Sequence, residues 1–356
     1  MFVFSPQSAL VLLLLVMAFG GLAYLVARRG HLALRVGAAT MAFVVSSVFG
    51  MALVNRFYDY YQTWDDLFND LSGKQPGEAT LPPSGGKNLA VGGDRAKNGL
   101  LVSTFLDGAK SKIARDGLVY LPPEYFQPAY RAAKFPVLEL MHGSPGKPAD
   151  WQTGLHLVET YRKLLGKKQV KPVIFVLPDV NGLRGGGAGS QCLDLPGSTQ
   201  DDTYLSTDVP ADVISQFRAD PVGAHWGIGG YSEGGFCAAN LALRHPGVYH
   251  VAASMSGYFQ PLPERGIDPF LGNASARLAN DPVWMATTAL PGARLPQFWL
   301  MAGSSDRGDV ESAKLFQSVL GKHEPVQMVL IPRARHTFAA WNPALPKMLI
   351  WATARI

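Results

Sequence analysis

The stretch Gly229–Phe236, "GGYSEGGF", places one serine among four glycines, between an apolar run and a run of good helix formers. Its central five residues, Gly230-Tyr231-Ser232-Glu233-Gly234, fit the pattern G-x-S-x-G, in which small neighbours permit a strained turn from a strand into a helix. Such a turn lifts the serine hydroxyl above the sheet. The context predicts that Ser232 is a nucleophile, and a plain glycine-rich turn is the alternative.

Short aliphatic runs alternate with helical patterns through the rest of the chain. The runs are "GLVYLPP", "FPVLELMHG", "PVIFVLPDV", "HWGIGGYS", "VAASMSG", "QFWLMAGSSD" and "VQMVLIPRARH", and helical stretches such as "GGFCAANLALRHP" and "DVESAKLFQSVLGK" fall between them. Continuous apolar runs are typical of strands buried on both faces of a parallel sheet. We therefore expect an α/β fold with a mostly parallel central sheet, whose earliest strand could be antiparallel.

Two further strand ends carry the residue types that a serine nucleophile needs. Asp306 ends "FWLMAGSSD", where an acid can orient an imidazole, and His336 follows the last strand, where its ring can take the serine proton and return it. Asp309 competes with Asp306, but it directly precedes the helix expected from Val310 and fits a helix cap better. The chain order Ser232, Asp306, His336 matches the order expected of this fold.

An oxyanion hole requires two backbone amides. We expect one from Glu233, which follows the nucleophile, and the other from Ser144, in the loop that follows "VLELMHG". His142, in the same loop, is a candidate substrate-binding residue, although a role in shaping the loop is favoured because it precedes the serine in the sequence. No metal ion or organic cofactor is expected, because no cluster of histidines and acids at ligand spacing is evident.

The N-terminal segment has the composition of a membrane anchor. Residues 1–27 carry no charge, and the apolar runs 8–27 and 36–55 are each long enough to cross a bilayer as a helix. The loop between them holds Arg28, Arg29, His31 and Arg35, which the positive-inside rule places in the cytoplasm. A cleaved signal peptide is the alternative, but no basic residue precedes the first run. We expect a multi-pass protein of the cell membrane, with its N-terminus and its catalytic domain outside the cytoplasm.

The sequence therefore divides into three parts. A transmembrane hairpin occupies residues 1–57, a juxtamembrane segment and Gly- and Pro-rich tether follows over 58–98, and an α/β domain takes up 99–356. Four of the 32 Lys and Arg residues lie in or beside the hairpin, and the other 28 nearly balance the 27 acids. A positive field for nucleic-acid binding is absent. The only cysteines, Cys192 and Cys237, can form a disulfide outside the cytoplasm or stay as free thiols.

From about Ser103 to its end, the chain resembles the α/β-hydrolases of the group that includes esterase D, feruloyl esterases and the mycobacterial mycolyltransferases. The resemblance rests on "GLVYLPPEYF", "FPVLELMHGSPG", "GGYSEGGFCAANLALRHP" and "RHTFAAWNPALP". It implies an α/β-hydrolase domain, a pairing of Cys192 with Cys237, and a likeness to actinobacterial envelope proteins. Glu233 departs from the mycolyltransferases and esterase D, which typically have an apolar residue after the nucleophile, and this argues against a long-chain mycolyl substrate.

The expected function is that of a membrane-anchored serine esterase. It would act through an acyl-enzyme on an acyl or aminoacyl ester of the cell envelope, with a lipid or glycolipid as the expected partner. An acyltransferase of the mycolyltransferase type and a non-catalytic binding module on the same fold are the alternatives. The Glu233 carboxylate could recognise a cationic aminoacyl ester, or it could interact with the amino end of the following helix.

Overall fold

The computed structural model describes residues 9–29, 31–58, 79–80, 86–180, 190–263, 268–290, 292–322 and 325–356. The chain forms two compact units, one built around the two N-terminal helices and the other around a large sheet. The predicted tether, residues 58–98, lies largely outside the described residues.

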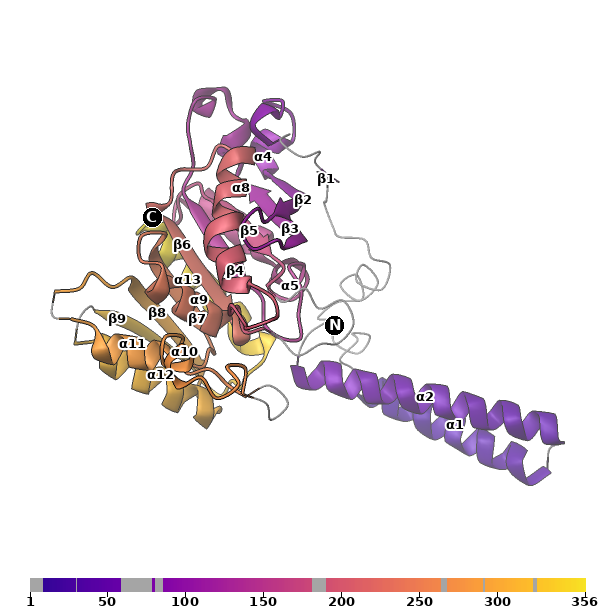
Figure 1. Ribbon diagram of the computed structural model, residues 1–356. Coiled ribbons are helices and arrows are strands. Elements are labelled where there is room, and N and C mark those ends of the chain that lie inside the picture. Colours follow the sequence, from indigo (N-terminus) through magenta and orange to yellow (C-terminus); the bar gives the residue numbers. More distant parts are fainter. Residues whose placement is uncertain are drawn as a thin grey trace. The chain divides into compact units, whose positions relative to one another are not determined.

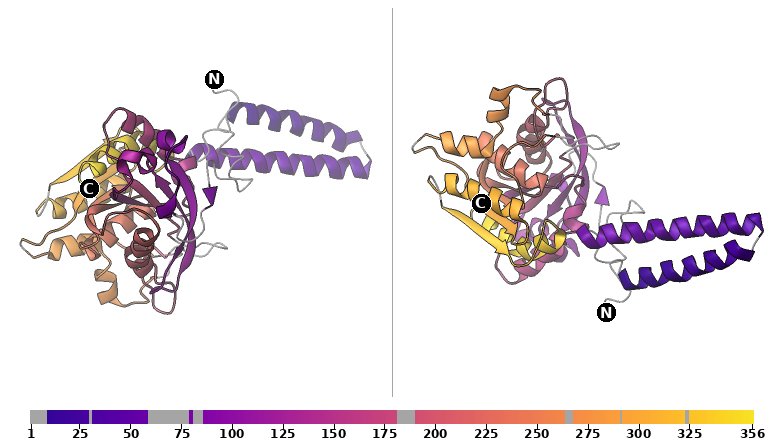
Figure 2. Two further views of the ribbon diagram at one scale, coloured as in Figure 1. Left: turned by 90° about the horizontal axis from the view of Figure 1, so that it is seen from above. Right: turned by 90° about the horizontal axis from the view of Figure 1, so that it is seen from below.

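The N-terminal unit is a pair of antiparallel helices, α1 (Ala9–Arg29) and α2 (Leu32–Tyr58) (Figures 1 and 2). Both helices were predicted, and α2 begins four residues earlier than expected. Among the described residues, one helical stretch is long and apolar enough to cross a membrane, Leu32–Asn55, with a mean hydropathy of 1.9. An N-terminal signal sequence would satisfy the same criteria. The first of the two predicted spans, 8–27, therefore stays a prediction.

The second unit is built on a nine-stranded sheet with the order β1-β2-β3-β5-β4-β6-β7-β8-β9. The strands are β1 (Ala79–Thr80), β2 (Leu100–Asp107), β3 (Ala114–Leu121), β4 (Val137–Met141), β5 (Ile174–Pro178), β6 (Gly223–Tyr231), β7 (Tyr249–Met255), β8 (Gln297–Gly303) and β9 (Val326–Ile331). From β5 to β9 all neighbours are parallel, whereas β3 is antiparallel to both β2 and β5. The mostly parallel sheet and its antiparallel start are as predicted.

Helices cover both faces of this sheet (Figure 1). On one face, Phe236 of α9 (Glu233–Arg244) and Phe316 of α12 (Arg307–Leu320) belong to one buried cluster with Val176 and Ile228 of the strands. On the other face, the Tyr161 ring of α6 (Leu157–Gly166) packs edge-on against Phe175, with ring centroids 4.8 Å apart. Burial on both faces explains why the central strands read as continuous apolar runs.

The remaining helices are short, apart from the C-terminal one. They are α4 (Arg95–Asn98), α5 (Asp150–Thr153), α7 (Asp201–Thr203), α8 (Val209–Gln216), α10 (Ala274–Leu278), α11 (Pro282–Thr288) and α13 (Phe338–Thr353), with single turns η1 (Gly86–Asn88), η2 (Pro123–Phe126), η3 (Pro128–Tyr130) and η4 (Tyr204–Asp208). Because β4 and β6 to β9 run in the same direction, the loops after their carboxyl ends meet at one edge of the sheet. The candidate site lies at this edge.

Candidate active site

Ser232 occupies the strained turn that the sequence predicted between β6 and α9. Its backbone has φ 57° and ψ −125°, a region that residues other than glycine rarely adopt. A Cβ atom on Gly230 would lie 2.1 Å from the Gly234 carbonyl oxygen, and one on Gly234 would lie 2.2 Å from that of Met141. Both glycines are therefore required by close backbone contact. The Ser232 amide donates to the Met255 carbonyl at 2.9 Å, which ties the turn to the end of β7.

The imidazole of His336 joins Ser232 to a carboxylate. Its Nε2 lies 2.8 Å from Ser232 Oγ, and its Nδ1 lies 2.9 Å from Asp309 Oδ2. In a neutral ring, Nδ1–H donates to Asp309 while Nε2 accepts the serine proton, which is the arrangement that general-base activation requires. The structure thus brings together the predicted nucleophile and the predicted base, with an acid three residues beyond the predicted one.

The predicted contact between Asp306 and the imidazole is wrong. Asp306 is the N-cap of α12, with φ −103° and ψ 102°, and its Oδ1 accepts a hydrogen bond from the Asp309 amide at 3.1 Å. The helix begins at Arg307 rather than near Val310, so Asp309 lies inside its first turn. Asp309, which was expected to cap the helix, contacts the imidazole. Asp306, which was expected to contact the imidazole, caps the helix.

The same three side chains form a group that sequence spacing did not reveal. Oxygen atoms of Asp306 and Asp309 and a ring nitrogen of His336 all lie within 4.8 Å of one another, close enough to surround a cation. However, the ligand atoms already have partners, because His336 Nδ1 contacts Asp309 and Asp306 caps the helix. The geometry fits a hydrogen-bonded serine, histidine and aspartate better than a metal centre.

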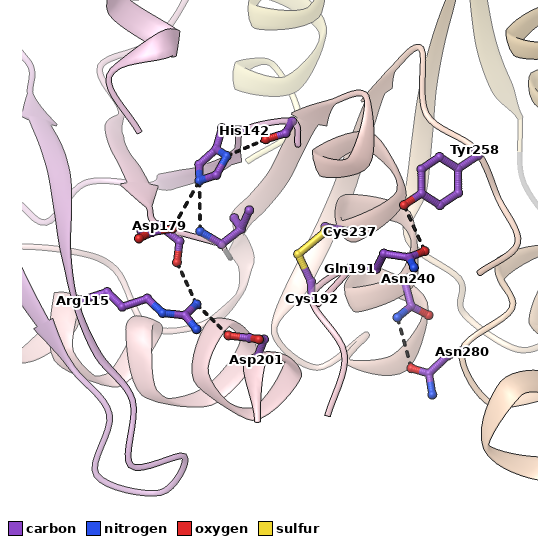
Figure 3. Close-up of a disulfide and its surroundings, with 12 residues drawn as sticks. Arg115, His142, Asp179, Gln191, Cys192, Asp201, Cys237, Asn240, Tyr258 and Asn280 are labelled. Carbon is purple, nitrogen blue, oxygen red and sulfur yellow. Dashed lines mark hydrogen bonds and ion pairs between the residues drawn. A yellow bond between two sulfur atoms is a disulfide. The ribbon is translucent and has the colours of Figure 1, made fainter. Parts of the chain in front are cut away.

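His142 shapes the loop after β4 and is fully buried. Its Nδ1 lies 2.8 Å from the Gly143 carbonyl oxygen, and its Nε2 accepts from the Val180 amide at 3.2 Å (Figure 3). Both ring nitrogens are therefore engaged by backbone in a neutral tautomer, and Asp179 Oδ1 is 3.6 Å from Nε2. The structure gives His142 the loop-shaping role and places no part of it where a substrate could reach it.

The predicted oxyanion donors flank the nucleophile. A Cβ atom on Gly143 would lie 3.0 Å from Ser232 Cβ, so the loop that carries Ser144 lies directly against Ser232. Glu233 opens α9, and its side chain is buried, with 4% of the residue exposed. The two amides stay predictions as oxyanion donors. A buried carboxylate in the first turn favours interaction with the helix end over recognition of a cationic substrate.

Three residues at the site carried no signal that we recognised in the sequence. Trp341 packs on Tyr231 with ring centroids 4.7 Å apart and edge-on against His336 at 5.2 Å. The Tyr231 hydroxyl lies 3.4 Å from Asp150 Oδ2, which also accepts from the Lys147 amide at 2.9 Å. Burial, and then the nearby Asp150 charge, raise the pKa of Tyr231 well above its usual value. Tyr231 stays protonated and links the nucleophile turn to the loop after β4.

The two cysteines form a disulfide beside the site, as the resemblance implied. Cys192 and Cys237 are bonded, with their Cα atoms 5.6 Å apart, and Cys237 lies five residues after Ser232 in α9 (Figure 3). The glycine-rich stretch 181–189 that precedes this bridge lies outside the described residues. The bridge attaches the segment of Cys192 to the helix that carries the nucleophile.

The chain matches a known protein family. Residues 111–352, more than half of the chain, match the family model described as "Putative esterase". An uncharacterized protein of Corynebacterium glutamicum is 26% identical over 264 residues, which are 72% of this chain and 61% of that protein. The chain thus spans about three fifths of the length of this relative.

Solved structures share the fold at lower identity. A ferulic acid esterase matches with a TM-score of 0.62 and 23% identity, covering 73% of this chain and 98% of its own. An S-formylglutathione hydrolase from Agrobacterium tumefaciens matches with a TM-score of 0.58 and 20% identity over 72% and 96% of the two chains. For Mycobacterium tuberculosis MPT51 (FbpC1), the TM-score is 0.52 and the identity 21%, over 71% and 97%. The sheet and its helices are thus those of the α/β-hydrolase fold.

Proposed function

Because the chain belongs to the Putative esterase family, we propose that it is a serine esterase that uses Ser232, His336 and Asp309 to form and hydrolyse an acyl-enzyme. The observation that carries the proposal is the continuous hydrogen-bonded series from Ser232 Oγ through the imidazole to Asp309, with distances of 2.8 and 2.9 Å. The strained turn that presents Ser232 supports it, since non-glycine residues adopt such a conformation mainly where function requires it.

The first half of the reaction forms the acyl-enzyme. Ser232 Oγ attacks the ester carbonyl carbon while its proton passes to Nε2 of His336, and the Asp309 carboxylate stabilises the imidazolium that results. The carbonyl oxygen becomes an oxyanion, for which the Glu233 and Ser144 amides are the proposed donors. The imidazolium then gives its proton to the leaving alcohol as the bond from carbonyl carbon to ester oxygen breaks.

The second half repeats these steps with water as the nucleophile. His336 takes a proton from water, the hydroxide attacks the acyl carbon, and Ser232 leaves with the proton returned by His336. An alcohol in place of water would give acyl transfer with the same three residues. The three side chains would act in the same way on water and on an alcohol. Product analysis with added glycerol or sugar therefore distinguishes hydrolysis from acyl transfer.

The proposed substrate is an ester of a lipid or glycolipid at the membrane that anchors the chain. Two observations support this location. The helix α2 contains a stretch of 24 residues with the length and composition of a membrane span, and the disulfide fits an oxidising compartment outside the cytoplasm. The substrate class is tested by presenting extracted envelope lipids to the purified full-length protein and identifying the acids released.

Labelling with a fluorophosphonate probe tests the reaction itself. The probe should label the wild-type protein at Ser232, and Ser232→Ala and His336→Ala should each lower turnover of p-nitrophenyl acetate by roughly 10⁴-fold or more, because the groups act as one unit. Ser215→Ala, which changes an exposed serine of α8, should keep full activity. Equal labelling of the wild type and Ser232→Ala would contradict the proposal.

A further inference from the structure

The segment that follows β7 borders the nucleophile on one side. Met255, at the end of β7, accepts the hydrogen bond of the Ser232 amide at 2.9 Å. Two residues later, a Cβ atom on Gly257 would lie 2.8 Å from the carbonyl carbon of Gly235, so this backbone passes directly over the first turn of α9. Residues 258–262 continue from this point.

An aromatic stack and a glutamine hold this segment. The Tyr258 ring stacks on Phe236 of α9, with centroids 4.8 Å apart and planes 13° from parallel. Gln191 Oε1 accepts from the Tyr258 hydroxyl at 3.0 Å and from the Leu262 amide at 3.0 Å, and its Nε2 donates to the Leu262 carbonyl at 2.7 Å. One buried side chain therefore holds both ends of residues 258–262. Figure 3 shows its contact with Tyr258.

The backbone of Gln191 is itself fixed relative to the nucleophile. Its neighbour Cys192 is bonded to Cys237 of α9, the helix that begins directly after Ser232. Gln191 and Cys192 have φ values of 51° and 55°, so two successive residues are held in the left-handed region. The disulfide thus fixes Gln191 relative to α9, and the hydrogen bonds of Gln191 fix Tyr258 and Leu262 relative to the same helix.

We propose that Gln191 is a positioning residue that determines which acyl groups the site accepts. It acts through Tyr258 and Leu262, which follow the Gly257 backbone that packs on the first turn of α9. They give this segment an aromatic and an aliphatic side chain, and 46% of Leu262 is exposed. Such a surface fits an extended apolar acyl chain and contributes nothing to an acetyl group. This inference rests on the proposed esterase reaction.

The test compares a short and a long ester on the full-length protein in detergent. Gln191→Leu removes all three hydrogen bonds at nearly constant volume, and kcat/KM for p-nitrophenyl octanoate should fall about tenfold, the effect of a misplaced hydrophobic contact on specificity. The value for p-nitrophenyl acetate should change less than about twofold. Gln191→Glu keeps both acceptor bonds but sets an oxygen in place of the donor to the Leu262 carbonyl, so it disturbs one of the three contacts and its effect should be intermediate.

A second buried glutamine provides the matched control. Gln216 of α8 also makes three hydrogen bonds, with Thr104, Phe105 and Asp212, at the end of the sheet that carries β2. Gln216→Leu should affect stability without changing the octanoate-to-acetate ratio. If Gln191→Leu does not fold, Tyr258→Phe removes one of the three bonds and should shift the ratio in the same direction.

Two results would overturn the inference. One is an equal loss on both esters in Gln191→Leu. The other is an unchanged ratio in Gln191→Glu and Tyr258→Phe, which would leave Gln191 with a structural role alone. Failure of the esterase proposal is distinguishable from both, because the wild type would then neither hydrolyse p-nitrophenyl acetate nor react with the fluorophosphonate probe.

Discussion

At the scale of single residues, Asp306 and Asp309 are two carboxylates three positions apart with different structural roles. Asp306 caps α12, and asparagine is as good a cap as aspartate. Asp309 contacts His336 Nδ1 at 2.9 Å and fixes the tautomer that can accept the serine proton. We therefore expect Asp309→Asn to lower kcat by roughly 10³- to 10⁴-fold and Asp306→Asn to lower it less than about threefold. Steady-state kinetics on p-nitrophenyl acetate measure both, and the reverse pattern would restore Asp306 as the acid.

The error in assigning the acid has a physical origin. The sequence predicted a helix from about Val310, but the helix begins three residues earlier, at Arg307. Gly308, directly before Asp309, is a poor helix former and obscured this earlier start. By contrast, Ser232 and His336 could be proposed as nucleophile and base because each follows an apolar run, Ser232 directly after β6 and His336 five residues after β9. The structure places their side chains in hydrogen-bond contact.

A second residue, Glu139, is a buried carboxyl that the proposed mechanism does not use. It lies in β4 with its Oε2 2.8 Å from the Tyr249 hydroxyl, which also lies 3.1 Å from the Leu205 carbonyl oxygen. Its other oxygen, Oε1, has no hydrogen-bond partner among the described residues. When Glu139 is ionised, the Tyr249 hydroxyl donates a hydrogen bond to its carboxylate. When Glu139 is protonated, its O–H can donate to the Tyr249 oxygen, and the Tyr249 O–H can donate to the Leu205 carbonyl. Burial raises the pKa of Glu139 to about 8, although the hydrogen bond to Tyr249 opposes this.

This shift predicts how stability depends on pH. In the unfolded chain Glu139 has a pKa near 4.5, so between pH 4.5 and about 8 the folded protein binds more protons than the unfolded one. Stability should therefore fall as the pH rises through this range, by at most about 1.4 kcal/mol per pH unit from this residue. Glu139→Gln should lose this part of the dependence. Thermal unfolding midpoints of both proteins at pH 5 and pH 8 provide the comparison, and parallel slopes would contradict the prediction.

At the scale of secondary structure, the sequence predicted most strands of the hydrolase unit but not how they are arranged. Buried strands such as β4 and β5 were evident from their aliphatic runs, whereas their exchange in the order β3-β5-β4-β6 depends on the path of the crossover connections. Strand β2 was not predicted. In its second half, buried and exposed residues alternate, which is a weaker signal than a continuous apolar run. Composition and spacing alone did not predict the hydrogen bonds of Gln191, since they join residues about 70 positions apart.

The disulfide connects a helix with a distant turn of the chain and stabilises their arrangement. It joins α9 to a segment 45 residues earlier in the chain. In the chain-entropy account, closing a loop of this length stabilises the fold by about 4 kcal/mol. The same bond brings Gln191 to the segment after β7, so stability and the geometry of the site depend on one covalent link. This dependence is a reason to place the hydrolase unit in an oxidising compartment.

At the scale of the whole molecule, the side of the membrane proposed for the hydrolase unit is the same with one span as with two. Arg28, Arg29 and Arg35 lie at or just beyond the amino end of α2, and no acidic residue precedes Asp59. From the positive-inside rule we expect this end in the cytoplasm and the carboxyl end of α2 outside it. If α1 also crosses the membrane, the N-terminus lies outside; if α2 alone crosses, it lies inside.

Topology reporters at the two ends separate these cases. A periplasmic-type phosphatase fused after Ile356 should be active and a cytoplasmic-type fluorescent reporter at the same place should be dark, because α2 directs the rest of the chain out of the cytoplasm. With two spans, an epitope placed before α1 should be reached by protease added to spheroplasts, and with one span it should be protected. Replacing Arg28, Arg29 and Arg35 with glutamine should weaken both results, since it removes the charges that hold the turn in the cytoplasm. A C-terminal fluorescent reporter that glows would contradict the outward placement of the hydrolase unit and, with it, an envelope lipid as the substrate.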